Sequence, residues 1–319
     1  MKILIYGAGV IGCTYGWQLS KAGCDVTVFV RQGKKQSIEE SGISIQCTDY
    51  REKPKKVEKV VFRPNVIDEL LPQNDYDYII VSVREEQLKG LLPALAQSAG
   101  KANILFFQNI WDVESIKNHF ATGCYFFGFP FMAGGGRKDK TIYSIIADSK
   151  YSKTMLGETN GEVIPRITEI TNVMEKAGMK PFVSEQIVNW LIPHYVFIAG
   201  LSAGIIASGG NMKSFTGNPK IVKKSIKAIR EGFQICEQRG INPKKEKVNK
   251  LYYLPLFICS PIVRKLFSNE VMASMFEGYL RCSTEEVKNM LEKIIASGEK
   301  YNIKTPYMKE FQKNIVNHL

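Results

Sequence analysis

The stretch that decides the fold is MKILIYGAGVIGCTYGWQLSKAGCDVTVFVR, residues 1–31. Its residues 3–6 form a short apolar run, which is typical of a parallel strand covered on both faces. The glycine-rich loop 7–12 follows, and after it apolar residues recur at helical spacing. A second apolar run, residues 26–30, completes a strand–loop–helix–strand unit. This order predicts an α/β Rossmann dinucleotide-binding domain that starts at the first residue.

The loop has the pattern Gly-x-Gly-x-x-Gly, and each glycine has a physical role. Gly7 allows the tight turn, Gly9 leaves room for a pyrophosphate, and Gly12 lets the helix pack closely against the strand. The diphosphate would accept hydrogen bonds from free N–H groups at the positive end of the helix. The predicted cofactor-binding residues of the loop are Gly7, Ala8, Gly9, Val10, Ile11 and Gly12.

The choice of cofactor depends on the residue after the second strand, where NAD-binding domains usually place a carboxylate for the ribose hydroxyls. Arg31 stands at this position, followed by Lys34 and Lys35. A guanidinium binds a 2'-phosphate that a carboxylate would repel, so the sequence predicts NADPH/NADP. The alternative is an ordinary surface arginine.

Two further residues follow buried strands. Arg84 ends the apolar run 78–83, and Asn109 follows the run 104–107. Ligands of such sheets bind at the carboxyl ends of the strands, so both residues are predicted to lie near the cofactor. A surface arginine and a turn-forming asparagine are the alternatives.

The pattern of elements changes near Ser184, from alternating strands and helices to helices alone. Residues 1–184 are therefore predicted to form the NADP-binding Rossmann domain, and residues 185–319 an all-helical C-terminal domain for substrate and dimerisation. We expect the substrate in the cleft between these two domains. Strands are expected at 125–131, 142–147, 155–157 and 181–183, with a flexible glycine segment at 134–136 and a helix at 165–176. The later helices are expected at 187–206, 221–238, around 251–266, 270–280, 284–301 and 306–316.

Composition excludes several classes of protein. The chain is 45% hydrophobic and 23% charged, as in ordinary globular proteins, and its first residues do not resemble a secretory signal. Seven scattered cysteines without a Cys-x-x-Cys pair disfavour disulfides and zinc, and His119, His194 and His318 lie too far apart in sequence to suggest a metal site. The sequence thus predicts a cytoplasmic protein without a metal ion. The apolar stretch 190–208 is interrupted by polar and small residues, which favours a buried helix.

The net charge is +12, which attracts anions. The densest basic stretches, 51–59 and 213–250, contain prolines and acidic residues and carry no nucleic-acid-binding motif. We therefore predict a solvated basic face and an acidic small-molecule substrate, with no nucleic-acid or membrane partner. A homodimer through the C-terminal helices is possible.

The order of motifs along nearly the whole chain resembles the ketopantoate reductase (2-dehydropantoate 2-reductase) family, the NADPH-dependent enzymes of pantothenate biosynthesis. The segments that carry this resemblance are the loop and arginine of residues 1–31, SVR at 82–84, FQN at 107–109, ASM at 273–275, STE at 283–285, and TP at 305–306. The resemblance implies an oxidoreductase that transfers hydride from NADPH to the carbonyl carbon of a 2-keto acid. The product would be the 2-hydroxy acid.

The chain departs from the family pattern at its proton donor. The family lysine falls on Leu191 or Ile192, neither of which can deliver a proton, and Gly278 replaces an acid next to Glu277. His194 is then the predicted catalytic acid, because its ordinary pKa suits proton donation near neutrality; the alternative is a core histidine. Tyr195 is the second candidate.

By resemblance, three retained residues would complete the site. Asn109 would lie near nicotinamide and substrate, Ser274 would bind the substrate, and Glu285 would orient the substrate or the acid. The predicted substrate-binding residues are Asn109, Tyr195, Ser274 and Glu285, and the predicted catalytic residues are His194, Asn109 and Glu285. For Glu285 the alternative is a carboxylate that stabilises a helix start.

Three functions remain open from the sequence. The first is NADPH-dependent reduction of ketopantoate or a related branched 2-keto acid. The second is reduction of another carbonyl compound, because positions 84, 191 and 278 change the charge and shape of the pocket. The third is a sensor that binds NADPH without turnover, since the fold by itself does not determine function.

Overall fold

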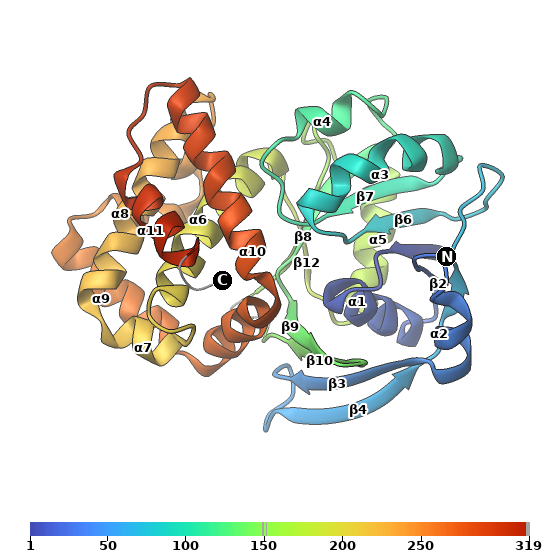
Figure 1. Cartoon of the computed structure of the whole chain (residues 1–319). Coiled ribbons are helices and arrows are strands. Elements are labelled where there is room, and N and C mark those ends of the chain that lie inside the picture. The colour runs from blue at the N-terminus through green and yellow to red at the C-terminus, as the bar shows by residue number, and fades with distance from the viewer. Residues whose placement is uncertain (149, 151, 317–319) are drawn as a thin grey trace. The chain divides into compact units, whose positions relative to one another are not determined.

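The computed structural model describes residues 1–148, 150 and 152–316 of the chain. The described residues form two compact units, Met1–Val188 and Asn189–Leu319 (Figure 1). The predicted domain boundary, after residue 184, lies just before helix α6 (Ile187–Ile206), whereas the boundary between the units falls inside this helix.

The first unit is built on an eight-stranded sheet with the order β12-β11-β8-β7-β6-β1-β2-β5. Six neighbouring strands run parallel to one another: β8, β7, β6, β1, β2 and β5. Strand β11 pairs antiparallel with β8. The central strand β1 is apolar and buried on both faces, as its sequence predicted. The strands are β1 (Lys2–Tyr6), β2 (Asp25–Phe29), β5 (Asn65–Ile67), β6 (Tyr78–Val81), β7 (Asn103–Phe107), β8 (Tyr125–Pro130), β11 (Thr154–Gly157) and β12 (Pro181–Val183).

A second, four-stranded sheet has the order β4-β3-β10-β9. Its strands are β3 (Ile43–Asp49), β4 (Lys56–Phe62), β9 (Ala133–Lys138) and β10 (Thr141–Ile146). The basic segment 51–59 covers the turn after β3 and the first residues of β4.

The expectation of a flexible segment at 134–136 is wrong, because these glycines form the middle of β9 and pair with β10. Gly135 has a φ of +121°, and a Cβ there would lie 2.0 Å from the carbonyl oxygen of Tyr143. Glycine is therefore required at this position by close strand packing.

Five helices accompany the strands of the first unit in the described residues: α1 (Val10–Lys21), α2 (Lys35–Ser41), α3 (Glu85–Ser98), α4 (Glu114–Lys117) and α5 (Pro165–Lys176). Buried hydrogen bonds tie α1 to the strands: Thr14 and Ser144 hydroxyls are 2.8 Å apart, and Tyr15 and Thr154 hydroxyls 2.7 Å apart. These bonds hold the helix that follows the glycine loop. The predicted α/β Rossmann fold with a following helical domain is confirmed.

The second unit contains α6, α7 (Met212–Gly217), α8 (Pro219–Gln238), the short 3-10 helices η1 (Pro243–Lys245) and η2 (Lys247–Tyr253), α9 (Leu256–Phe267), α10 (Glu270–Lys300) and α11 (Pro306–Val316). Two separate helices were expected where the structure has α10. Ser283, with φ −129° and ψ 18°, interrupts the helical backbone, so the two expected helices meet at a kink.

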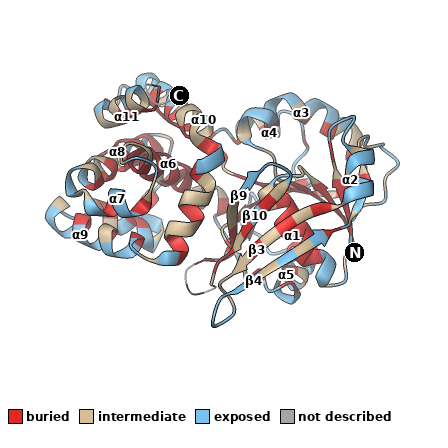
Figure 2. Ribbon diagram, turned by 60° about the horizontal axis from the view of Figure 1, so that its bottom comes forward, coloured by how far each residue is buried: buried red, intermediate tan, exposed pale blue. Residues whose placement is uncertain are grey.

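Helix α6 is apolar on all sides, and buried residues follow its length in Figure 2. Among the described helices it is the one long and apolar enough to cross a membrane, and 78% of that apolar window is buried inside the protein. This burial is typical of a core helix, as the sequence predicted.

Candidate dinucleotide-binding and active site

The glycine loop joins β1 to α1 at the carboxyl end of the central strand. Gly9 is the N-cap residue of α1, no side chain caps the helix, and no acidic residue stands in its first turn. Gly7 has a φ of +124°, a conformation that glycine adopts without strain. The first N–H groups of α1 are thus left for an anion, which the helix dipole attracts.

The glycines at positions 9 and 12 have opposite surroundings. A Cβ on Gly12 would lie 2.2 Å from the carbonyl oxygen of Gly7 and 2.5 Å from Ser82 Oγ, so Gly12 allows close packing of helix and strand. A Cβ on Gly9 would meet nothing within 4 Å. Gly9 therefore borders open space, as a residue that lets a diphosphate approach should.

Two residues that the sequence analysis missed hold this loop. Ser82 Oγ donates a hydrogen bond to the carbonyl oxygen of Gly7 at 3.1 Å, and Arg137 Nη2 donates one to that of Ala8 at 2.8 Å. Arg137 also brings a positive charge to the loop, which favours a bound diphosphate. Ser82 lies in a motif that carried the family resemblance, but no sequence signal connects Arg137 in β9 to the loop.

Arg31 lies two residues beyond the end of β2 and is exposed. Lys34 is the N-cap residue of α2 and is also exposed, so this end of the strand is basic. Between this end and the glycine loop, the rings of Tyr6 and Phe29 stack with centroids 4.2 Å apart. Exposed cations therefore stand at the end of β2, where a Rossmann domain reads the ribose of its cofactor.

The ends of β6 and β7 are joined through a carboxylate. Glu85 Oε1 accepts a hydrogen bond from the backbone N–H of Trp111 at 2.8 Å, which links the exposed Arg84 segment to the Asn109 loop. Among the described atoms, Asn109 Oδ1 and the side-chain amide of Gln108 are buried without a hydrogen-bond partner. Buried polar atoms without partners are costly, so this strand end is suited to a polar ligand.

The other predicted residues belong to the second unit. Tyr195 is 1% exposed, as are Leu191 and Ile192, where the family lysine would fall. Ser274 is half-buried on α10, and the exposed Glu285 forms an ion pair with Lys288, 3.2 Å between Oε1 and Nζ. The predicted site residues are thus divided between the units, and the structure assembles the cofactor-binding set within the first.

His194 is a buried residue of α6. Its ring stacks on Trp190, with 4.5 Å between centroids, and lies tilted against Phe197 at 5.8 Å. Burial lowers the pKa of His194 from its usual value near 6.5 to about 3. At neutral pH the imidazole is therefore uncharged. A neutral ring can donate a hydrogen bond but is a weak acid.

This lowered pKa leads to a prediction about stability. Because the unfolded chain binds a proton on His194 below pH 6.5 and the folded chain does not until about pH 3, stability falls as pH decreases through this window. Between about pH 6.5 and 4.5 the protein should lose about 2 kcal/mol more unfolding free energy than the variant His194→Gln. Urea denaturation at several pH values measures the unfolding free energy of both proteins. The same pH dependence for both would contradict a buried, neutral His194.

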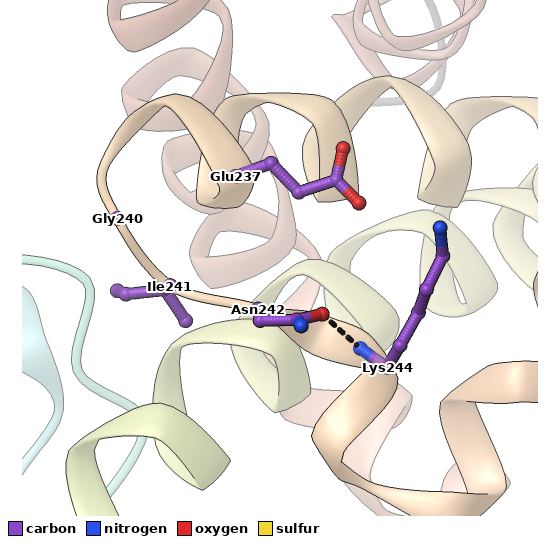
Figure 3. Close-up of a pocket in the computed structure, with 5 residues that line it drawn as sticks. All are labelled: Glu237, Gly240, Ile241, Asn242 and Lys244. Atoms are coloured by element: carbon purple, nitrogen blue, oxygen red, sulfur yellow. Dashed lines mark hydrogen bonds between the residues drawn. The ribbon is translucent and has the colours of Figure 1, made fainter.

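Potential metal ligands do not cluster in the part of the chain that the structure describes. It contains no group of three or more potential metal ligands, and its seven cysteines are free; His318 lies outside the described residues. One cavity of about 430 Å³ in the second unit is lined by Glu237, Gly240, Ile241, Asn242 and Lys244 (Figure 3). None of the predicted site residues lines it.

The residues that carry the glycine loop are also the ones that resemble a known family. Residues 3–148 match the model of the family described as ketopantoate reductase PanE/ApbA. The chain is 25% identical over 207 residues to the uncharacterized oxidoreductase YkpB of Bacillus subtilis, a match that spans 64% of each protein. It is 22% identical over 312 residues to the 2-dehydropantoate 2-reductase of Aquifex aeolicus, 96% of this chain and 93% of that protein. D-mandelate dehydrogenase, solved with NADH and anilino(oxo)acetate, has the same fold with a TM-score of 0.79 at 16% identity, covering 99% and 97% of the two chains.

The Rossmann loop and these matches place the chain in the class of NAD(P)-dependent oxidoreductases. Within that class, its first unit carries the signature of the ketopantoate reductase family, as the motif order predicted.

Proposed function

We propose that this protein reduces a 2-keto acid to the 2-hydroxy acid with NADPH, and that ketopantoate, the precursor of pantoate in pantothenate synthesis, is the first substrate to test. The proposal depends mainly on the glycine loop, with its uncapped helix end, its open space at Gly9 and its supporting contacts from Ser82 and Arg137. The family match over the same residues supports it. A bound NADPH would supply the hydride.

The chain's own residues would bind and orient the cofactor. The N–H groups at the start of α1 would hold the diphosphate, and Arg31 the 2'-phosphate. Arg84 and Asn109, after β6 and β7, would bind cofactor or substrate polar groups, and the partnerless Oδ1 of Asn109 supports this role.

Leu191 or Ile192 stands where the family has the lysine that donates the proton. His194 would donate a hydrogen bond from its uncharged ring to the developing alkoxide, since burial keeps it neutral. The proton that completes the 2-hydroxy acid would then come from solvent water. Ser274 and Glu285 would contact the substrate, and Tyr195 is the second candidate for the group that bonds the alkoxide. If His194 has this role, His194→Gln should lower kcat while the Kd for NADPH stays the same; an unchanged rate would assign His194 to the core alone.

The decisive experiment is oxidation of NADPH in the presence of a panel of 2-keto acids. The panel includes ketopantoate, smaller branched 2-keto acids and an aromatic 2-keto acid, each measured with NADPH and NADH. We expect the highest kcat/KM with a branched 2-keto acid and NADPH. Turnover only with the aromatic acid and NADH would favour a dehydrogenase like the structural relative that binds NADH. Cofactor binding without any turnover would favour a sensor.

Cofactor preference gives a separate prediction. Arg31→Ala should weaken NADPH binding by about tenfold or more and leave NADH binding nearly unchanged, because only NADPH has the 2'-phosphate. Fluorescence titration with both cofactors measures this. The control is Arg63→Ala, which removes an arginine whose guanidinium bonds the exposed carbonyl of Glu40 away from the glycine loop. Equal affinities of the unchanged protein for the two cofactors would refute the role of Arg31.

A further inference from the structure

Helix α9 is apolar on its outer face as well as its inner face. Its inner residues Cys259, Val263 and Phe267 are buried. Its outer side carries an exposed stripe, here called the α9 face, which Figure 2 shows among the exposed parts of the second unit. The α9 face consists of Phe257, Ile258, Ile262 and Leu266 in the helix and of Leu254 just before it. Ile258, Ile262 and Leu266 are spaced four residues apart and therefore lie along one side of the helix.

The exposed apolar side chains of the second unit are concentrated in one segment. Phe257 is 74% exposed, and Val248 in the adjoining η2 is 73% exposed. Every large apolar side chain classed as exposed within the described residues of the second unit lies between positions 248 and 266. Neighbouring exposed apolar side chains often mark a surface that binds a partner, so the α9 face points to one.

The same part of the chain carries the excess positive charge. Residues 213–265 contain thirteen Lys and Arg residues and three Glu residues. One of the three, Glu231, is buried and accepts hydrogen bonds from the backbone N–H groups of Tyr307 and Met308. The lysines nearest the α9 face in sequence are exposed: Lys244, Lys245, Lys247, Lys250 and Lys265.

We propose that the α9 face docks on the surface of an anionic lipid bilayer. Apolar side chains on one side of a helix, flanked by lysines, are the features of helices that lie in a membrane interface. The apolar residues would enter the boundary between headgroups and acyl chains, and the lysines would contact lipid phosphates. The sequence alone favoured a solvated basic face without a membrane partner, because it did not show that α9 exposes its apolar side.

Charge and side-chain chemistry disfavour a second copy of the chain or a nucleic acid as the partner of the α9 face. Two copies of the chain that met through this face would bring their lysines together, and such repulsion weakens a symmetric contact. Single-stranded nucleic acid requires aromatic side chains for base stacking, and the α9 face has only Phe257.

The test is cosedimentation of the full chain with vesicles. We expect binding to vesicles with about 30% phosphatidylglycerol to be at least about tenfold tighter than to pure phosphatidylcholine, and to be lost in about 0.5 M NaCl. Phe257→Ser/Ile262→Ser should weaken binding to the anionic vesicles about tenfold or more, and Lys247→Gln/Lys250→Gln should also weaken it. The matched control is Leu71→Ser/Val163→Ser, which changes two exposed apolar residues of the first unit and should have no effect.

Several results would overturn the proposal. One is no binding to anionic vesicles by a chain that melts cooperatively and is therefore folded. A second is vesicle binding that depends on the lysines but not on Phe257 and Ile262, which indicates electrostatic adsorption without docking of the α9 face. A third is self-association that Phe257→Ser/Ile262→Ser abolishes in the absence of vesicle binding. The outcome is independent of the proposed reductase activity, because vesicle binding is measured without substrate.

Discussion

Replacing Gly9 by valine should lower the affinity for NADPH by about 100-fold, equivalent to about 2.7 kcal/mol, while the protein stays folded. The backbone of Gly9 has φ −82° and ψ −174°, which any residue adopts, and a Cβ there meets no atom within 4 Å. The valine side chain would instead occupy the space in front of the first N–H groups of α1. A diphosphate could then no longer reach those donors.

The measurement is a fluorescence titration with NADPH, together with a thermal melt. Gly90→Val is the matched control, because Gly90 also borders open space but lies within α3, away from the loop. Gly12→Ala should behave differently and lose stability, since its Cβ would lie 2.2 Å from the Gly7 carbonyl oxygen. Normal NADPH binding by a folded Gly9→Val variant would rule out the glycine loop as the diphosphate site.

Replacing Arg166 by methionine should destabilise the first unit by about 3–5 kcal/mol, because the change leaves a buried carboxylate without its partner. Arg166 and Glu158 are 8% and 5% exposed, and their two N···O contacts are both 2.6 Å. Arg166 Nη2 also donates to the carbonyl oxygen of Tyr125 at 3.1 Å, and Nη1 to that of Gly123. The side chain therefore joins α5 to the strand β8 and to the segment before it.

Urea denaturation of the full chain measures this loss. The double variant Arg166→Met/Glu158→Leu should lose less than Arg166→Met alone, because it leaves no buried charge. The control is Lys117→Met, which breaks an exposed ion pair with Glu114 and should cost at most about 0.5 kcal/mol. Similar losses for Arg166→Met and Lys117→Met would show that the buried pair does not support the fold.

Much of the fold could be predicted from local sequence patterns. The bounds expected for α5 and α6 agree with those observed, because Pro165 begins one helix and a sustained apolar pattern marks the other. The glycines 134–136 were misjudged, since their strand depends on pairing with β10 and not on their own composition. Pairing between distant segments leaves no local signal.

The candidate site also has a part that the sequence predicted and a part that only the folded chain shows. The glycine loop was predictable because a turn, an open approach and a close contact each require glycine locally. Ser82 and Arg137 hold that loop from 75 and 129 residues away in sequence, so only the folded chain shows their contacts. The roles of Asn109, Ser274 and Glu285 stay predictions.

The sequence by itself determined that the first unit is a Rossmann domain with a glycine loop for a dinucleotide, because this geometry is encoded in consecutive residues. Only the tertiary structure decided the state of His194 and of α9. The pKa of a histidine depends on the solvent it loses on burial, and the exposure of an apolar helix face depends on which neighbours cover it. Both are properties of packing between distant parts of the chain.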